Sequence, residues 1–117
     1  MLSATNRLRS KREFKYAFKK GNSLNSRYLV LVAVKNFKKY SKFGIVVTKK
    51  IGNAVCRNSV KRKIREILRI NLADIKTGYN FILLTKPGIE TQNYTEIQKS
   101  IVFLLEKGGY LNKCELL

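Results

Sequence analysis

Three stretches rich in large apolar residues predict strands. Residues 27–35 place apolar side chains at both odd and even positions, which is typical of a strand covered on both faces. Residues 43–48 and 79–85 have the same character, and a Pro-Gly pair follows the last of them. Gly44 interrupts the second stretch, where we expect a bulge or the close approach of another element.

Apolar residues at helical spacing predict a first helix over about residues 11–20. Ser10 and Glu13 have the spacing of a capping box, in which each side chain satisfies a free amide at the helix start. Gly21 stands where a left-handed cap would end the helix. The apolar side consists of Phe14, Ala17 and Phe18, and lysines and arginines occupy much of the rest.

A second helix is predicted from about Arg57 to Leu72. At about 100° per residue, its apolar and cationic positions separate onto opposite sides of the axis. The apolar side holds Val60, Ile64, Ile67 and Leu68, and the other side holds Asn58, Lys61, Arg62, Arg65 and Arg69. A third helix begins at Asn93, carries an apolar stripe of Ile97, Ile101, Leu104 and Leu105, and ends at Gly108 and Gly109.

The predicted order is therefore helix, strand, strand, helix, strand, helix. This order indicates an α+β fold in which helices pack on a small sheet, and residues 1–117 are of the usual length for a single domain. Residues 43–85 form a candidate βαβ unit. General rules make such a crossover right-handed in about 98% of cases.

Positive charge dominates the composition and is unevenly distributed. The chain carries a formal charge of +18, which indicates a nucleic acid or an acidic membrane surface as partner. Residues 1–69 hold 20 of the 25 lysines and arginines and only two acids, whereas residues 70–117 hold five of each sign. We expect the polyanion to contact the first half and the second half to support it.

The densest cationic stretch is residues 49–69, with eight basic residues and one acid, Glu66. Like charges at i,i+4 cost an isolated helix a few tenths of a kcal/mol per pair, a cost that an anionic partner reverses. Gly52 allows a sharp turn that brings Lys49 and Lys50 near the helix start. Solvated helix faces usually mix both signs, so this one-sided display favours polyanion binding.

Residue types needed for nuclease chemistry are sparse. The chain has no histidine, and its seven acids are scattered at Glu13, Glu66, Asp74, Glu90, Glu96, Glu106 and Glu115. Two-metal nucleases need clustered carboxylates, and metal-free ribonucleases commonly use histidine. Cys56 and Cys114 fit neither a metal spacing nor a disulfide framework and are expected to be free thiols. No apolar run suggests a membrane span or signal peptide, so a cytoplasmic location is expected.

The cationic stretch resembles the signature region of the bacterial ribonuclease P protein subunit. The residues that carry the resemblance are the run 49–55 (KKIGNAV), Arg57-Asn58, Lys61-Arg62 and Arg65. Other parts fit the same family: Arg7-Leu8-Arg9, Phe14, Phe18, Gly21, Arg27 and Lys86-Pro87. The resemblance covers the chain to about Gly108.

That resemblance implies a fold and a function. The fold is α+β, with three helices on a small mixed sheet, a fourth short strand and a rare left-handed βαβ crossover. The function is that of the accessory subunit of a ribonucleoprotein endoribonuclease, which uses Mg²⁺, held mainly by a catalytic RNA, to remove the 5′ leader of precursor tRNA. The implied partners are the catalytic RNA and precursor tRNA, with no membrane and no DNA.

The family also implies two groups of contact residues. Lys49, Lys50, Asn53, Arg57, Asn58, Lys61, Arg62 and Arg65 would dock on the catalytic RNA, with Arg69 beside them on the same helix side. Phe14, Lys15, Phe18, Val32 and Lys86 would line a cleft for the single-stranded leader. Where family members carry an aromatic cleft residue this chain has Val32, so weaker stacking is expected there.

Three other functions fit parts of the sequence. A small ribosomal or other structured-RNA-binding protein would be equally basic, and would co-purify with ribosomal RNA. A helix-turn-helix DNA-binding protein would place the second helix in a major groove, but a strand rather than a helix is predicted just before it. A self-sufficient nuclease would cleave precursor tRNA without any RNA subunit.

Overall fold

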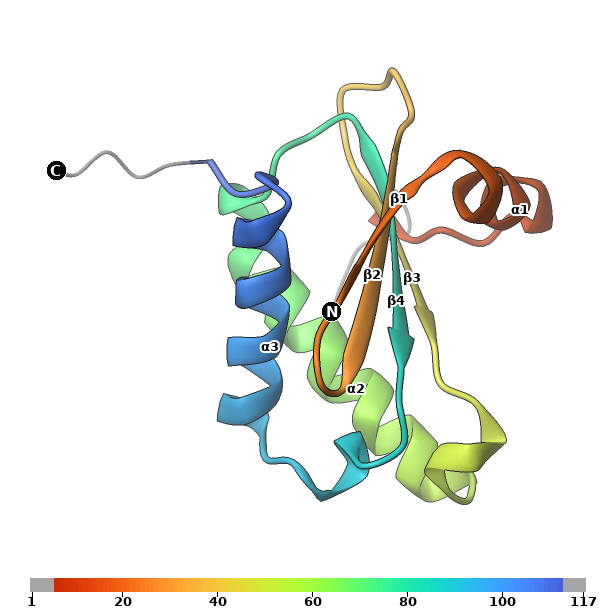
Figure 1. Ribbon diagram of the computed structural model, residues 1–117, viewed down its shortest axis with the longest axis vertical. Helices are drawn as coiled ribbons and strands as arrows, with labels where there is room; N and C mark the ends of the chain where they lie inside the picture. The colour runs from red at the N-terminus through yellow and green to blue at the C-terminus, as the bar shows by residue number, and fades with distance from the viewer. Residues whose placement is uncertain (1–5, 113–117) are drawn as a thin grey trace, which may run out of the picture.

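The computed structural model describes residues 6–112, which form three α-helices and a four-stranded sheet (Figure 1). The elements in chain order are α1 (Lys11–Lys20), β1 (Asn22–Asn25), β2 (Leu29–Lys35), β3 (Lys42–Val46), α2 (Ala54–Asn71), β4 (Tyr79–Thr85) and α3 (Tyr94–Lys107). Short 3₁₀ turns lie at η2 (Lys49–Ile51), η3 (Leu72–Asp74) and η4 (Ile89–Thr91). Each predicted helix and strand is present.

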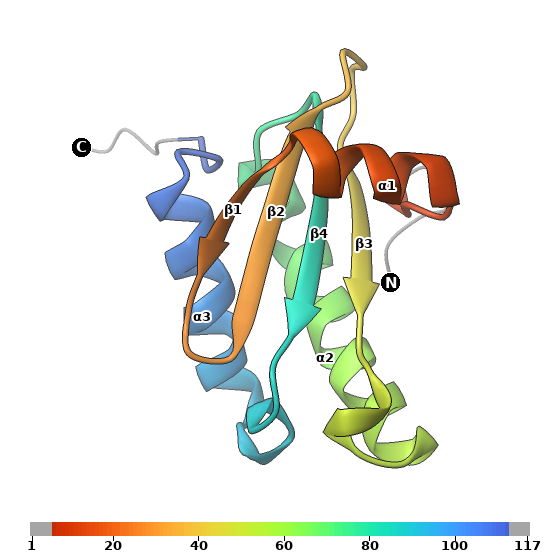
Figure 2. The same cartoon turned by 45° about the vertical axis from the view of Figure 1, so that its right-hand side comes forward.

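The sheet has the order β1-β2-β4-β3, with β3 and β4 parallel and the other neighbours antiparallel. In Figure 2, β3 and β4 both run downward, β4 lies to the left of β3, and α2 passes behind them. Turned so that α2 faces the viewer and the strands point up, the chain moves from β3 leftward to β4. The crossover is therefore left-handed, as the family resemblance implied and against the general rule.

Helices cover both faces of the sheet. On one face α2 and α3 close the larger core, and on the other α1 crosses above the strands (Figures 1 and 2). The larger core contains Leu29, Leu31, Phe43, Phe81 and Leu83 from the strands and Val60, Ile64, Ile67, Leu68, Ile97, Ile101, Leu104 and Leu105 from the helices. The apolar stripes predicted for the second and third helices are thus the buried ones.

The first helix has its predicted bounds, but its two ends differ from expectation in detail. At the start, the Ser10 hydroxyl accepts a hydrogen bond from the Glu13 amide at 3.4 Å. The Glu13 carboxylate pairs with Lys42 at 3.5 Å, so the second half of the capping box is replaced by an ion pair. At the end, the left-handed conformation predicted for Gly21 is wrong, because its φ is −79° and its ψ is 163°.

Glycine is needed at position 21 because the surrounding backbone leaves no room for a side chain. A Cβ there would lie 2.5 Å from the Ala17 carbonyl oxygen and 2.9 Å from the Ala33 carbonyl oxygen. Gly44 has a related role, because a Cβ on it would lie 2.6 Å from Cζ of Phe14. The close approach predicted at Gly44 is confirmed, and both glycines let α1 pack directly on the sheet.

The strand that the residue pattern did not locate is β1, which pairs with β2 through a short turn. Its sequence NSLN contains one apolar side chain, and three of its four residues are exposed at the edge of the sheet. The helix α2 begins at Ala54, three residues before the predicted start at Arg57. Asn53 caps this helix by accepting a hydrogen bond from the Cys56 amide at 2.9 Å.

Candidate nucleic-acid interface

The polar side of α2 presents cations in successive turns, because its other side is fixed in the core. Val60, Ile64, Ile67 and Leu68 are buried, which turns the opposite side outward. That side carries Asn58, Lys61, Arg62 and Arg65, each partly or fully exposed. The predicted separation of the two sides is confirmed, and the three cations among these residues follow one helix face.

Further cations gather at the start of α2. Lys49 and Lys50 are exposed in the turn η2, and Gly52, with φ of 152°, connects this turn to the cap residue Asn53. Arg57 lies in the first turn of the helix, and its Nε atom is buried with no hydrogen-bond partner. Free amides at a helix start carry partial positive charge, so this end adds to the positive potential of the lysines.

Arg69, at the far end of the same face, differs from the other cations. Its guanidinium donates two hydrogen bonds to the Glu66 carboxylate, at 2.6 and 3.0 Å. The hydrogen bond from Arg69 lowers the pKa of Glu66, and Glu66 raises the pKa of Arg69. Both side chains are on the surface, with Arg69 47% exposed. The charge of Arg69 is therefore shared with an acid of its own chain, and its predicted RNA contact stays a prediction.

Two hollows lie along α2, and one of them reaches the N-terminal segment. One is lined by Asn58, Arg62, Arg65 and Glu66, and the other by Arg7, Leu8, Arg9, Phe14, Phe43, Ile45 and Arg65. Arg65 borders both. The second hollow exists because Leu8 donates its amide to the Phe43 carbonyl oxygen at 2.9 Å, which holds the N-terminal segment along the free edge of β3. The cationic surface of α2 therefore continues to Arg9, a residue not predicted as part of the site.

Next to this hollow, α1 leaves part of the sheet face open. The rings of Phe14 and Phe18 lie 6.4 Å apart, and Phe18 is 50% exposed. Val30, Leu84 and Val46 are register neighbours on three adjacent strands, on the same face as Val32, and each is only partly buried. These three residues therefore form an apolar strip on the face of the sheet beside α1, with an accessible aromatic ring next to it.

The other residues predicted for the leader cleft have different surroundings. Lys15 is exposed on α1. Val32 is 5% exposed beneath α1, so it offers little surface to a ligand, while its neighbour Val30 offers more. Lys86 donates a hydrogen bond from Nζ to the Ser26 carbonyl oxygen at 2.7 Å, which holds it at the end of β4. The alternation of a strand is the signal that would have found Val30, Val46 and Leu84.

The described residues do not bring metal-binding side chains together. Within residues 6–112, no three His, Cys, Asp or Glu side chains lie close enough to hold a metal ion. Magnesium prefers carboxylate oxygens, phosphates and water as ligands, and the described carboxylates do not gather into a group of three. Cys56 is a free thiol, whereas Cys114 lies outside the described residues. No described helix is long and apolar enough to cross a membrane.

These features define a nucleic-acid-binding protein of the α+β class. They are a cationic face on α2, a cationic hollow beside it, and an apolar strip with an accessible aromatic ring on a small sheet. The sequence model of the family described as Ribonuclease P matches residues 2–109. This chain therefore belongs to the ribonuclease P protein family.

Relatives and solved structures agree with this family. The ribonuclease P protein component of Clostridium botulinum strain Loch Maree is 36% identical, over 92% of this chain and 97% of that protein. That of Clostridium acetobutylicum is 38% identical, over 89% of each chain. The structure of the Staphylococcus aureus RNase P protein aligns with a TM-score of 0.85 at 30% identity, covering 92% of this chain and 98% of the other. The structure of the RNase P protein from Thermotoga maritima aligns with a TM-score of 0.80 at 34% identity, covering 86% of this chain and 96% of the other.

Membership of this family makes the chain a protein component of an endoribonuclease, with an RNA partner and a role in tRNA processing. The α+β fold implied by the resemblance is confirmed.

Proposed function

We propose that this protein docks on the catalytic RNA of ribonuclease P and holds the single-stranded 5′ leader of precursor tRNA. The predominantly cationic face of α2 is the observation that carries the proposal, because an apolar side fixed in the core leaves Lys61, Arg62 and Arg65 directed outward. Lys49, Lys50, Asn53, Arg57, Asn58 and Arg69 extend this docking surface along α2 and the turn before it.

Electrostatic positioning is the proposed mechanism. Lysines and arginines that approach phosphates release condensed counterions, so six to ten such contacts lose about 10³- to 10⁵-fold in affinity between 50 and 200 mM salt. By screening the repulsion between the two RNAs, the protein tightens binding of precursor tRNA and lowers the magnesium concentration that the reaction requires.

The leader lies in the open strip beside α1 in this proposal. Phe18 supplies an accessible ring, Phe14 stands next to it, and Val30, Val46 and Leu84 form an apolar floor. Stacking of a base on an aromatic ring contributes about 1–3 kcal/mol and tolerates any base. Lys15 supplies an exposed ammonium on α1. Val32 lies on the same sheet face beside this strip, where α1 covers it.

Bond cleavage is assigned to the RNA. The chain has no histidine to act as acid and base, and its described acids do not gather around a metal. We therefore place Mg²⁺ on the RNA subunit. Because tRNA precursors are the substrate, we place the protein in the cytoplasm.

Duplex DNA is a poor fit as partner. A helix-turn-helix reader needs a second helix packed just before the recognition helix. In residues 6–112, α2 instead follows β3 and the turn η2. A ribosomal or other structured-RNA protein is the remaining alternative, and it differs by tracking ribosomal RNA rather than one substoichiometric catalytic RNA during purification.

Leader-dependent binding tests the proposal. The affinity of the catalytic RNA for precursor tRNA and for mature tRNA is measured with and without the protein. We expect the protein to tighten precursor tRNA selectively, and Phe18→Ala to reduce that selectivity while docking on the RNA subunit is retained. Equal stimulation of both tRNAs removes the leader assignment, and clean 5′ cleavage by the protein alone removes the assignment of catalysis to RNA.

A further inference from the structure

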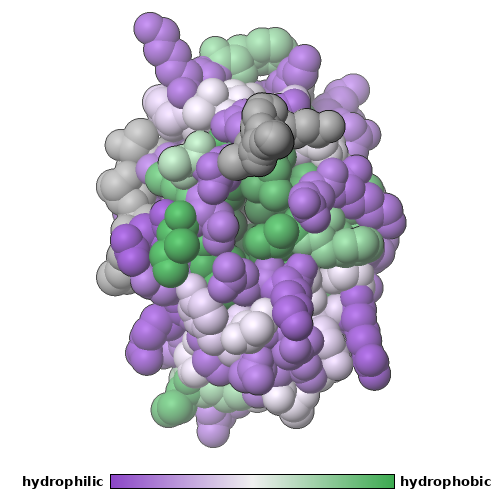
Figure 3. All heavy atoms as spheres, turned by 90° about the vertical axis from the view of Figure 1, so that its left-hand side faces the viewer, coloured by the Kyte–Doolittle hydropathy of each residue, from purple (hydrophilic) through white to green (hydrophobic). Residues whose placement is uncertain are grey.

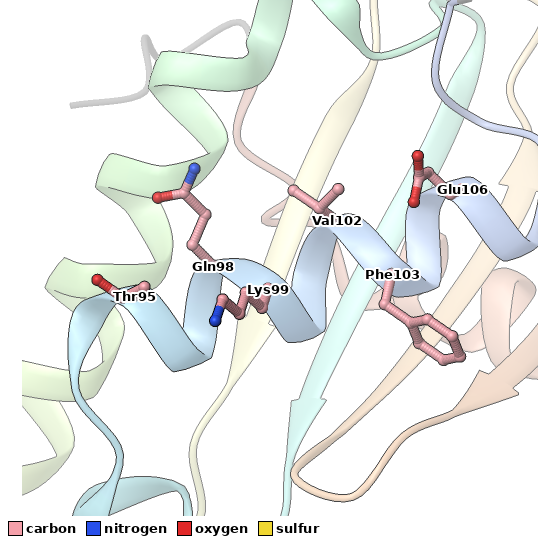
Figure 4. A pocket seen from close by; sticks show the side chains of 6 residues that line it. All are labelled: Thr95, Gln98, Lys99, Val102, Phe103 and Glu106. Atoms are coloured by element: carbon pink, nitrogen blue, oxygen red, sulfur yellow. The ribbon is translucent and has the colours of Figure 1, made fainter.

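The outward side of α3 lies outside the RNA-binding surfaces proposed above. It is hollowed between Thr95, Gln98, Lys99, Val102, Phe103 and Glu106 (Figure 4). The buried side of the same helix, Ile97, Ile101, Leu104 and Leu105, fixes this orientation. At the centre of the outward side, Val102 is partly exposed and Phe103 is 52% exposed, and Figure 4 shows the two side chains spreading to opposite sides of the helix.

The charge of this side sets it apart from the rest of the molecule. The whole chain carries +18, so two copies repel each other across most of their surfaces. Residues 70–117 are balanced, with five charges of each sign. In Figure 3, which faces the α3 side, apolar atoms gather at mid-height among polar ones. This is where two copies can meet with the least repulsion.

The order of residues along α3 is self-complementary. Lys99 and Glu106 are seven residues apart, about 10.5 Å along the axis, and they bracket the Val102-Phe103 pair. An antiparallel copy reverses this order, so that Lys99 of each copy meets Glu106 of the other. The same reversal sets Val102 opposite Phe103. A twofold arrangement of this kind repeats every favourable contact, as in most homodimers.

We propose that the outward side of α3, centred on Val102 and Phe103, binds a second copy of this chain in an antiparallel, twofold arrangement. The cationic side of α2 and the strip beside α1 are formed by other residues, so a dimer presents two RNA-binding surfaces at once. One helix side buries less than the roughly 800 Å² per partner of a standard interface, so we expect a weak association.

Sedimentation equilibrium of the full chain without RNA, from 10 µM to 1 mM at 300 mM salt, tests this proposal. At that salt concentration the long-range repulsion between copies is screened, since the Debye length is well below 10 Å. We expect a monomer–dimer equilibrium that Phe103→Asp abolishes. Lys99→Glu and Glu106→Lys alone should each weaken it about 10-fold, because each creates two like-charge contacts. The double variant should restore it, because both pairs re-form with exchanged signs.

Lys76→Glu is the matched control, since it makes the same charge change at an exposed position outside this side of α3. Thermal unfolding followed by circular dichroism verifies that every variant is folded. A protein that stays monomeric to 1 mM overturns the proposal, as does a dimer that the α3 variants leave unchanged. Weaker binding to the catalytic RNA by Phe103→Asp, with a monomeric parent protein, would assign this surface to RNA and also overturn it.

Discussion

Removing the negative charge of Glu66 should strengthen RNA binding by the docking surface proposed on α2. Its carboxylate lies on the edge of the hollow shared with Asn58, Arg62 and Arg65, and it holds Arg69 through two hydrogen bonds. The substitution Glu66→Gln removes the charge and weakens the hold on Arg69. The change therefore adds about one effective cation to the interface.

The size of the effect follows from counterion release. Each phosphate contact contributes a slope of about −0.9 to log K against log salt, so one added contact strengthens binding about 8-fold at 100 mM salt and about 4-fold at 200 mM. Because the lowered pKa of Glu66 keeps its carboxylate charged at neutral pH, the gain is fully present there. Below the folded-state pKa the carboxylate is neutral, and the parent and the variant should bind alike.

Filter binding to the catalytic RNA between 50 and 300 mM salt measures both the gain in affinity and the slope of log K against log salt. Glu96→Gln is a matched control, because Glu96 pairs with Lys99 at the same i,i+3 spacing on α3, at 3.7 Å. The control should leave RNA affinity unchanged. Unchanged or weaker binding by Glu66→Gln, with a normal melting temperature, refutes the inference that Glu66 opposes the RNA.

Three further outcomes are expected. Phe18→Ala should weaken leader-dependent binding of precursor tRNA by about 1–3 kcal/mol per stacked base while urea unfolding changes little, because the ring is 50% exposed. Gly44→Ala should lower the free energy of unfolding by about 1–3 kcal/mol, because the new methyl group must displace Phe14; urea titration measures this, and an unchanged midpoint contradicts the packing. Gly21→Ala should destabilise at least as much in the same titration, since it meets the rigid Ala17 carbonyl oxygen.

The elements with strong periodicity were predictable from sequence. The apolar stripe of α2, Val60 to Leu68, and the caps Ser10 and Asn93 each leave a local pattern that determines a helix. The strand β1 leaves none, because NSLN has the composition of a loop and becomes a strand only by pairing with β2. Handedness of the crossover is likewise a property of the whole packing.

The candidate site was predictable to a similar extent. Helix geometry places the cations of α2 on one face, so their spacing in the sequence alone was sufficient to predict that face. The hollow between Arg9 and Arg65 depends on where the N-terminal segment meets β3, which no local pattern encodes. Val32 illustrates the limit of a resemblance: its strand was predicted, but whether α1 covers it depends on the close approach at Gly21.

The salt dependence of RNA binding tests the central claim most directly. Two triple alanine variants are compared. The first replaces Lys61, Arg62 and Arg65 on α2, and the second replaces Lys76, Lys99 and Lys107 elsewhere. If the α2 face contacts phosphates, the first variant loses about 2.7 units of the slope of log K against log salt, and the second loses none. Equal slopes for the two variants would contradict the account, because binding would then follow total charge rather than the face of one helix.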